Sequence, residues 1–213
     1  WENHRAIFET AGFPVDSYPY YDAATRGVNF AAMKSCLNSL QAGSIIVLHA
    51  CCHNPTGADL TEAQWREIIE VIQARGLVPF IDMAYQGFAD GIAEDALALN
   101  LFVASGLQFF VSTSYSKSFS LYGERVGALS VITASKDESA RVLSQIKRMI
   151  RSNYSNPPTH GGAVVAAVLG SPELRQMWEA ELVVMRERIK TMRSSLVEKK
   201  KKKGVAQDFS FVI

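Results

Sequence analysis

One lysine stands where it could act as a nucleophile. Lys117 closes the segment 112–117 (STSYSK), in which hydroxyl side chains follow an apolar run. Removal from water favours the neutral form of a lysine amine, which can form a Schiff base with an aldehyde. Ser114 and Ser116 beside it could hydrogen-bond a phosphate. A single lysine is more often a solvated surface charge, so this interpretation depends on partners elsewhere in the chain.

Asp82 and Tyr85 follow another apolar run, residues 77–81. A carboxylate at the end of a strand could hold a cationic ring nitrogen. Tyr85, three residues further on, could reach the same ligand if the turn between them is helical. The alternative is that Asp82 only caps a helix that follows.

The segment 49–57 (HACCHNPTG) offers two histidines and two cysteines. These four side chains crowd into five residues, unlike the paired spacing of structural zinc sites, so we expect no metal here. Asn54 in the same segment could present its amide to a ligand oxygen. Further along, Arg125 in the segment 121–127 (LYGERVG) could bind a phosphate with two parallel hydrogen bonds. Its simpler interpretation is a surface pair with Glu124.

The elements that must position these residues alternate between strands and helices. The apolar segments 44–48, 77–81, 107–112 and 128–133 lack clean alternation, which is typical of strands buried on both faces of a parallel sheet. Between them, Thr61 opens a helix with a capping box, and Gly76 ends it. Helices are also expected over 94–105 and 137–151. This order predicts an α/β fold with a mostly parallel sheet, whose ligands bind beyond the carboxyl ends of the strands.

The C-terminal part of the sequence predicts one long helix. Ser171 is a good N-cap and Pro172 suits the first helical position. Apolar residues then recur at helical spacing from Leu174 to Leu196, which we interpret as core packing. After Gly204, the residues 208–213 are expected to begin a new strand.

Composition excludes several classes of protein. The chain has 213 residues, a formal net charge of +1 and 48% hydrophobic residues. This apolar content excludes disorder for most of the chain, and the near-neutral charge favours neither nucleic acid nor a membrane surface as a partner. No apolar run reaches the roughly 18 residues of a transmembrane helix. Only three cysteines are present, which favours a reducing compartment and a cytoplasmic protein.

Taken together, these side chains describe a site for an anionic, aromatic cofactor that carries an aldehyde. Pyridoxal 5′-phosphate has these properties, since it takes a lysine Schiff base and a carboxylate partner for its ring nitrogen. At this point the sequence resembles a known family, on five segments in particular. These are CCHNPTG (51–57), DMAYQGF (82–88), STSYSK (112–117), YGERVG (122–127) and NYSNPP (153–158).

The chain resembles the class I aminotransferases of the aspartate and aromatic amino-acid branch, over essentially its whole length. The resemblance implies the large domain of fold type I, an α/β domain in which helices flank a mostly parallel sheet. It also implies three parts: a partial cofactor-binding large domain (1–170), a long connecting helix (171–204) and the start of a small domain (205–213). Members of the family continue beyond both ends of this stretch, so we expect the chain to be truncated at both ends.

The resemblance also implies a role for individual residues. Lys117 would form the Schiff base with pyridoxal 5′-phosphate and then move a proton. Asp82 would pair with the ring nitrogen, and His4 and His49 would support Asp82 from behind. The remaining cofactor contacts would be a ring stack by Trp1, bonds to the phenolic oxygen from Asn54 and Tyr85, and phosphate binding by Ser114, Ser116 and Arg125.

Substrate and assembly follow from the same resemblance. Arg151 would reach into a neighbouring subunit of a homodimer and meet the distal carboxylate of a substrate, with Trp1 and Asn54 also near the substrate. From the residues alone, Arg151 is simply a charge on the exposed face of a helix. The reaction implied is transfer of an amino group from an aromatic or dicarboxylic L-amino acid to a 2-oxo acid such as 2-oxoglutarate. The alternatives are a non-catalytic fragment of such an enzyme and a lyase of fold type I that uses the same cofactor.

Overall fold

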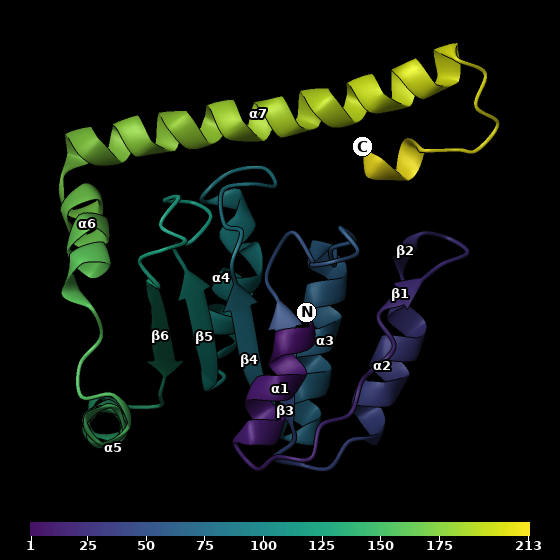
Figure 1. Cartoon of the computed structure of the whole chain (residues 1–213). Helices are drawn as coiled ribbons and strands as arrows, with labels where there is room; N and C mark the ends of the chain where they lie inside the picture. Colours follow the sequence, from purple (N-terminus) through teal and green to yellow (C-terminus); the bar gives the residue numbers. More distant parts are fainter.

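Four apolar segments form one sheet in the computed structural model, which describes residues 1–213 (Figure 1). The strands are β3 (Ile45–His49), β4 (Val78–Met83), β5 (Phe109–Ser114) and β6 (Gly127–Ile132), in the order β3-β4-β5-β6. β3, β4 and β5 are parallel, and their register sets His49 beside Asp82 and Asp82 beside Ser112. The carboxyl ends of these three strands therefore meet at one edge of the sheet, as expected.

Seven helices surround the sheet. They are α1 (Glu2–Thr10), α2 (Phe30–Ser39), α3 (Glu62–Arg75), α4 (Leu97–Ser105), α5 (Lys136–Asn153), α6 (Thr159–Gly170) and α7 (Pro172–Lys202). A 3₁₀ turn, η1 (Glu94–Ala96), precedes α4, and the two-residue strands β1 (Tyr21–Asp22) and β2 (Gly27–Val28) pair with each other. The capping box at Thr61 and the left-handed Gly76 that ends α3 are both present. None of the helices combines the length and the apolar character that crossing a bilayer requires.

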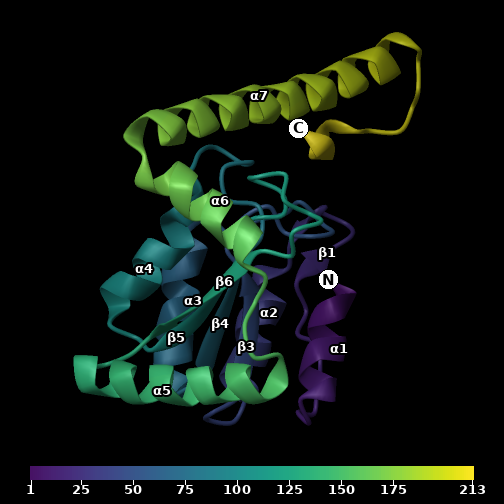
Figure 2. The ribbon, with the colours of Figure 1, turned by 60° about the vertical axis from the view of Figure 1, so that its left-hand side comes forward.

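The main core lies between the sheet and the helices α2, α3 and α4. Burial alternates along β3 and β4, so that Ile46, Leu48 and Ile81 are almost inaccessible while their neighbours are only half-buried. The expectation that both faces are fully buried is therefore wrong. α1 covers part of the second face, where the Phe8 and Phe80 rings lie 5.7 Å apart. Figure 2 shows α3 and α4 on the opposite side of the sheet from α1.

Two other expectations about strands need correction. β6 is antiparallel to β5, and its first four residues are exposed. An apolar run cannot by itself report the direction of the strand. The expected strand over 208–213 is instead a 3₁₀ turn, η2 (Ser210–Val212). The Asp208 carboxylate accepts hydrogen bonds from both the backbone N–H and the hydroxyl of Ser210, which favours a tight turn over an extended chain.

The long helix α7 begins as predicted, with the Ser171 hydroxyl accepting from the Leu174 N–H and Pro172 in the first turn. Its apolar stripe is not all core, however. Leu182 is 1% exposed, but Met192 is 51% exposed and Leu196 is 45% exposed. The helix passes over the sheet at the edge where β3, β4 and β5 end and continues beyond it, as Figures 1 and 2 show. The buried residues of α7, Leu182 and Arg186, therefore lie in its first half, and beyond them the helix contacts the C-terminal segment, where the Lys200 amine lies 4.8 Å from the centroid of the Phe209 ring.

Candidate active site

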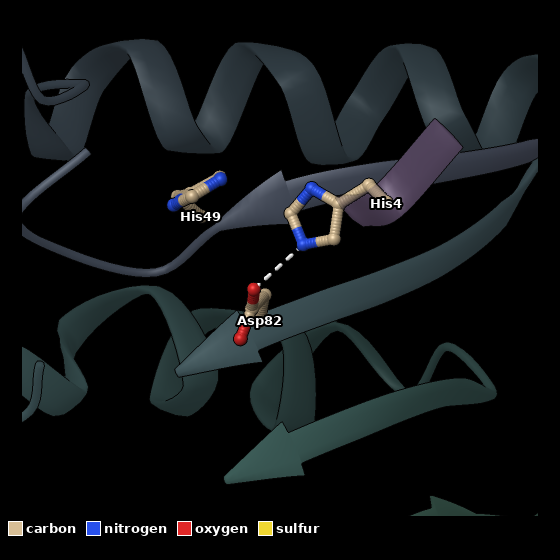
Figure 3. A group of neighbouring side chains, drawn as sticks. All are labelled: His4, His49 and Asp82. Carbon is tan, nitrogen blue, oxygen red and sulfur yellow. Dashed lines mark hydrogen bonds and ion pairs between the residues drawn. The ribbon is translucent and has the colours of Figure 1, made fainter. Parts of the chain in front are cut away.

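A histidine from α1 and a carboxylate from β4 meet at the carboxyl edge of the sheet (Figure 3). His4 Nε2 lies 2.7 Å from Asp82 Oδ2, and the two side chains are 20% and 12% exposed. The rings of His4 and His49 lie 5.2 Å apart, with His49 at the end of the neighbouring strand β3. The other carboxylate oxygen, Oδ1, has only a long contact of 3.4 Å with the Ser112 hydroxyl. This oxygen keeps its capacity to accept a hydrogen bond from a ligand.

The electrostatics of this group favour a charged Asp82 beside a neutral His49. Burial raises the pKa of Asp82, but the hydrogen bond from His4 and the charges of His4 and His49 outweigh burial, and the net shift is downward. Burial is the main reason why the pKa of His49 falls to about 4, with the Asp82 charge opposing the shift. At neutral pH the sheet edge therefore holds an ionised carboxylate supported by histidines.

The segment that follows β3 is held by an acid that the sequence analysis did not select. The Asp59 carboxylate accepts the backbone N–H groups of Cys52 and His53, at 2.7 and 2.8 Å. The His53 ring stacks on Tyr20 at 4.0 Å, and burial lowers the pKa of His53 to about 4. The two histidines and two cysteines of this segment do not form one cluster. His49 groups with His4 and Asp82, whereas the two cysteines group with Asp95.

Lys117 lies on a short turn directly after β5. The N–H of Phe119 donates to the Tyr115 carbonyl, and the N–H of Ser120 donates to the Lys117 carbonyl. The serines on either side, Ser116 and Ser118, are buried, while Lys117 itself is half-buried. The Lys117 ammonium nitrogen lies 4.8 Å from the centroid of the Tyr85 ring. The turn therefore brings the amine next to the aromatic side chain that follows β4.

Tyr85 lies on the loop between β4 and η1, and a buried carboxylate organises that loop. Asp95 is 5% exposed, and its two oxygens accept the backbone N–H groups of Gly87, Ala89, Asp90 and Gly91. A buried charge is stable only when it is well bonded, and four N–H donors meet this requirement. Asp95 was not predicted from the sequence, because an acid in the first turn of a helix is usually an exposed cap.

Arg125 lies on the loop between the Lys117 turn and β6. It is exposed, its φ angle is +53°, and its Nη1 donates to the Tyr122 carbonyl at 2.8 Å. A non-glycine residue in this left-handed region is uncommon and occurs more often at functional sites. The Tyr115 N–H donates to the Val126 carbonyl at 3.1 Å, which joins this loop to the turn that carries Lys117. Ser114, at the end of β5, accepts the Ser116 N–H at 3.3 Å.

Gly161 on α6 packs closely against Glu124 and Val126, the two residues that flank Arg125. We predict that a methyl group at position 161 destabilises the fold. A Cβ atom on Gly161 would overlap the Val126 side chain and lie 2.8 Å from the Glu124 Cβ. Overpacking of this kind lowers the free energy of unfolding by about 1–3 kcal/mol. Gly161→Ala should therefore lower the urea midpoint of unfolding. Gly162→Ala is the matched control, since nothing lies within 4 Å of its Cβ and alanine favours a helix. Equal midpoints for the two variants would contradict the packing argument.

The remaining predicted residues lie at the margin of this group or away from it. Trp1 is 54% exposed, its ring meets His4 at 5.0 Å, and its amino group lies 3.4 Å from the Asn54 carbonyl. Trp1 and Asn54 line the same surface pocket. Arg151 is in the last turn of α5, where Nη1 bonds the Ser155 hydroxyl. Figure 1 shows α5 at the opposite end of the sheet from the Lys117 turn, so the fold does not bring Arg151 to this group.

Comparison with known proteins places the chain in a family. The model of the family described as aminotransferase class I and II matches residues 1–213. An aspartate aminotransferase from Pseudomonas aeruginosa is 65% identical over 212 residues, which cover 100% of this chain and 53% of that protein. The aromatic-amino-acid aminotransferase of Escherichia coli is 54% identical over 198 residues, which cover 93% of this chain and 50% of that protein.

A solved structure agrees with these sequence relatives. The crystal structure of an aromatic-amino-acid aminotransferase from Burkholderia pseudomallei, covalently bound to pyridoxal phosphate, has a TM-score of 0.98 and 66% identity with this chain. The match covers 100% of this chain and 53% of that one. The chain thus spans about half the length of the relatives that it matches.

Proposed function

Because the chain belongs to the class I and II aminotransferase family, we propose that it carries the cofactor-binding part of a pyridoxal 5′-phosphate-dependent transaminase. The whole protein moves an amino group from an aromatic or dicarboxylic L-amino acid to a 2-oxo acid such as 2-oxoglutarate. The observation that carries this proposal is the meeting of three strand ends. There Asp82 offers a carboxylate oxygen whose one contact is the long 3.4 Å bond from the Ser112 hydroxyl, and the Lys117 amine lies beside the Tyr85 ring.

The donor set fits the cofactor in charge and in kind. Asp82 is ionised, and its Oδ1, which has only the long bond from the Ser112 hydroxyl, can accept a further N–H donor. The Lys117 amine has no hydrogen bond or ion pair to another side chain, so it is free to react with an aldehyde. Ser114 ends β5, and Ser116 and Arg125 lie on the loop that follows it. Their hydroxyl groups and guanidinium are the kinds of group that bind a phosphate.

Pyridoxal phosphate, when bound, supplies an aldehyde for the amino group and a ring that accepts the electrons left at the substrate Cα. Asp82 holds a proton at the ring nitrogen, and His4 fixes the orientation of the carboxylate through its 2.7 Å bond. Lys117 holds the aldehyde and then, as a free amine, moves a proton away from the substrate Cα. General acid–base help of this kind typically contributes about 10²–10⁴-fold to the rate.

The other residues bind and orient. Asn54 and Tyr85 hydrogen-bond the phenolic oxygen of the cofactor. Ser114, Ser116 and Arg125 hold its phosphate, and Trp1 stacks on its ring. In this proposal Trp1 and Asn54 also border the bound amino acid. We assign no metal to the site.

The assembly proposed for the whole protein is a homodimer with shared sites. Arg151, which lies away from the residues of its own chain's site, then serves the site of the neighbouring subunit and meets the distal carboxylate of the substrate. Residues 1–170 form the partial large domain, 171–204 the connecting helix and 205–213 the start of the small domain. The free cysteines agree with a cytoplasmic location.

The choice of substrate is the point at which the relatives differ. One is named an aspartate aminotransferase and another an aromatic-amino-acid aminotransferase, at 65% and 54% identity. We propose that the protein accepts both kinds of side chain and favours the aromatic kind. Assays of the full-length protein with L-aspartate and L-phenylalanine, each with 2-oxoglutarate, test this through formation of the two 2-oxo acids. Turnover of neither donor would contradict the proposed function.

The same assays test the lyase alternative, and a titration of residues 1–213 with pyridoxal phosphate tests the non-catalytic one. A lyase releases carbon dioxide, or a 2-oxo acid together with ammonia, without converting 2-oxoglutarate to glutamate. A non-catalytic role for residues 1–213 on their own predicts saturable binding of pyridoxal phosphate by this piece and no amino transfer. Glutamate formed in equal amount to the new 2-oxo acid supports the transaminase.

A further inference from the structure

One face of α7 contacts both loops that carry the proposed reactive residues. Trp178, Leu182 and Arg186 are spaced four residues apart, so they lie along one side of the helix. Leu182 is 1% exposed and Arg186 is 9% exposed, although most of α7 faces solvent. This face points to the Lys117 turn at one end and to the Tyr85 loop at the other.

At the first end, α7 holds the turn that follows Lys117. The Trp178 Nε1–H donates to the Ser118 carbonyl at 2.7 Å. The Trp178 ring also stacks on Phe119, with the ring centroids 4.5 Å apart. Ser118 is buried and directly follows Lys117 in the chain. The helix therefore fixes the peptide next to the proposed nucleophile by both a hydrogen bond and an aromatic stack.

At the second end, a buried anion and a buried cation hold the two peptide groups that flank Gly87, one at its N–H and one at its carbonyl. The Gly87 N–H donates to Asp95 Oδ2 at 2.7 Å, and Arg186 Nη1 donates to the Gly87 carbonyl at 2.8 Å. Gly87 has a φ angle of +95°, and a Cβ atom there would lie 3.1 Å from a methyl group of Leu182. Side chains are thus excluded from this position by both conformation and packing. The loop that carries Tyr85, two residues earlier, is held directly against α7.

Arg186 is satisfied only in part by this arrangement. Its Nε is buried and has no hydrogen-bond partner, and Glu187, the acid nearest to it, is 3.9 Å away and largely exposed. A buried cation with an unused donor destabilises the fold relative to an apolar side chain. Stability therefore does not explain this residue, whereas a need to hold the Gly87 carbonyl in one place does.

We propose that Trp178 and Arg186 are positioning residues, which act through α7 to fix the Lys117 turn and the Tyr85 loop relative to each other. The inference rests on the proposed function, in which the two side chains meet the same cofactor. The Lys117 nitrogen and the Tyr85 ring are 4.8 Å apart. Eight residues of helix, which span about 12 Å, separate the two contacts that set this spacing. Neither Trp178 nor Arg186 touches the reacting atoms.

Hydrogen exchange of the full-length protein without cofactor tests the two contacts separately. The amides of Ala89, Asp90 and Gly91, all bonded to Asp95, report on the Tyr85 loop. Those of Phe119 and Ser120 report on the Lys117 turn. We expect Arg186→Met to speed exchange in the first group by about tenfold or more, and Trp178→Phe to do so in the second. Trp178→Phe keeps an aromatic ring for the stack, although a smaller one, and removes the N–H donor.

A matched control is available on the same helix and the same loop. Lys190 is exposed and bonds the exposed Asp90 at 3.1 Å, so Lys190→Met removes a cation that contacts the loop tip and leaves the Gly87 contact intact. We expect exchange in this variant to match that of the wild type. Arg186→Lys, which can still donate to the Gly87 carbonyl, should restore much of the protection that Arg186→Met loses.

The loaded enzyme gives a second readout. We expect the pH midpoint of the visible absorption band of bound pyridoxal phosphate to shift in Trp178→Phe and Arg186→Met but not in Lys190→Met. Lower melting temperatures together with unchanged exchange patterns and an unchanged pH midpoint would overturn the proposal and leave both residues as plain packing. If Arg186→Met does not fold, Trp178→Phe and Arg186→Lys carry the test. A wild-type protein that binds no pyridoxal phosphate contradicts the proposed function, and the exchange experiment still decides the role of α7.

Discussion

Replacing Lys117 with alanine should lower the rate of amino transfer by about 10⁴-fold in the full-length protein, the upper end of what general acid–base catalysis contributes. The lysine amine has two tasks in the proposed mechanism, because it holds the cofactor and then moves the proton at the substrate Cα. The Lys117 amine is the one that lies over the Tyr85 ring, 4.8 Å from its centroid, so its loss removes the amine from this position. Single-turnover measurements of the conversion of L-phenylalanine, with the cofactor saturating, test the prediction.

The matched control is Lys201→Ala, at the exposed C-terminal end of α7. Its rate should equal that of the wild type. Addition of a small primary amine to Lys117→Ala should restore part of the lost rate, because the amine supplies the missing base in solution. A Lys117→Ala protein with more than a tenth of the wild-type rate would exclude this lysine as the reactive group.

The second large effect is expected at Asp82. Asp82→Asn keeps the shape of the side chain but removes the negative charge that holds a proton on the ring nitrogen, so kcat should fall by about 10²–10⁴-fold. The pKa of Asp82 is lowered in the folded protein, so the carboxylate is ionised at every pH above its ordinary value. The loss in Asp82→Asn should therefore be the same at pH 6 and at pH 9.

Asp90→Asn is the control for this substitution, since Asp90 is an exposed acid on the loop that follows the same strand. It should change kcat by less than about twofold, because an exposed ion pair contributes little. Asp82→Glu should keep part of the activity, because the charge remains but is displaced by one methylene group. Wild-type kcat in Asp82→Asn would show that the carboxylate does not act on the ring nitrogen.

The site residues at the ends of strands could be predicted from the pattern of apolar and polar residues in the sequence. Asp82 and Lys117 each follow a short apolar run, and the parallel register of β3, β4 and β5 then brings the ends of those runs to one edge. The capping box of Thr61 and the left-handed Gly76 are local features, set by hydrogen bonds within a few residues. Such features depend on residues that are close in the sequence, so they can be predicted from the sequence before the fold is known.

Contacts between distant segments could not be predicted from local pattern. His4 meets Asp82 across 78 positions of the chain, and only the resemblance to a family suggested that pair. Arg186 meets Gly87 across 99 positions, and nothing near either residue indicates the contact. Asp95 was missed for a similar reason, since its burial follows from the path of the whole loop.

Strands and helices were also predicted wrongly, or missed, where their arrangement depends on segments that are distant in the sequence. The antiparallel direction of β6 depends on the loop 115–126, which carries Lys117 and returns the chain directly from the end of β5, and an apolar run does not report the path of that loop. α6 was not predicted, because its apolar and glycine-rich sequence lacks helical periodicity. The stripe on α7 has the spacing of a core helix, yet Leu182 is its one fully buried apolar residue, and Met192 and Leu196 remain about half exposed.

The most direct test of the central claim is to locate the covalent bond. The full-length protein is loaded with pyridoxal phosphate, reduced with borohydride and digested, and each lysine-containing peptide is weighed by mass spectrometry. We predict that the reduced cofactor is attached to the peptide that contains Lys117 and to no other. Label on a different lysine, or a protein that carries no label after saturation with the cofactor, would contradict the account.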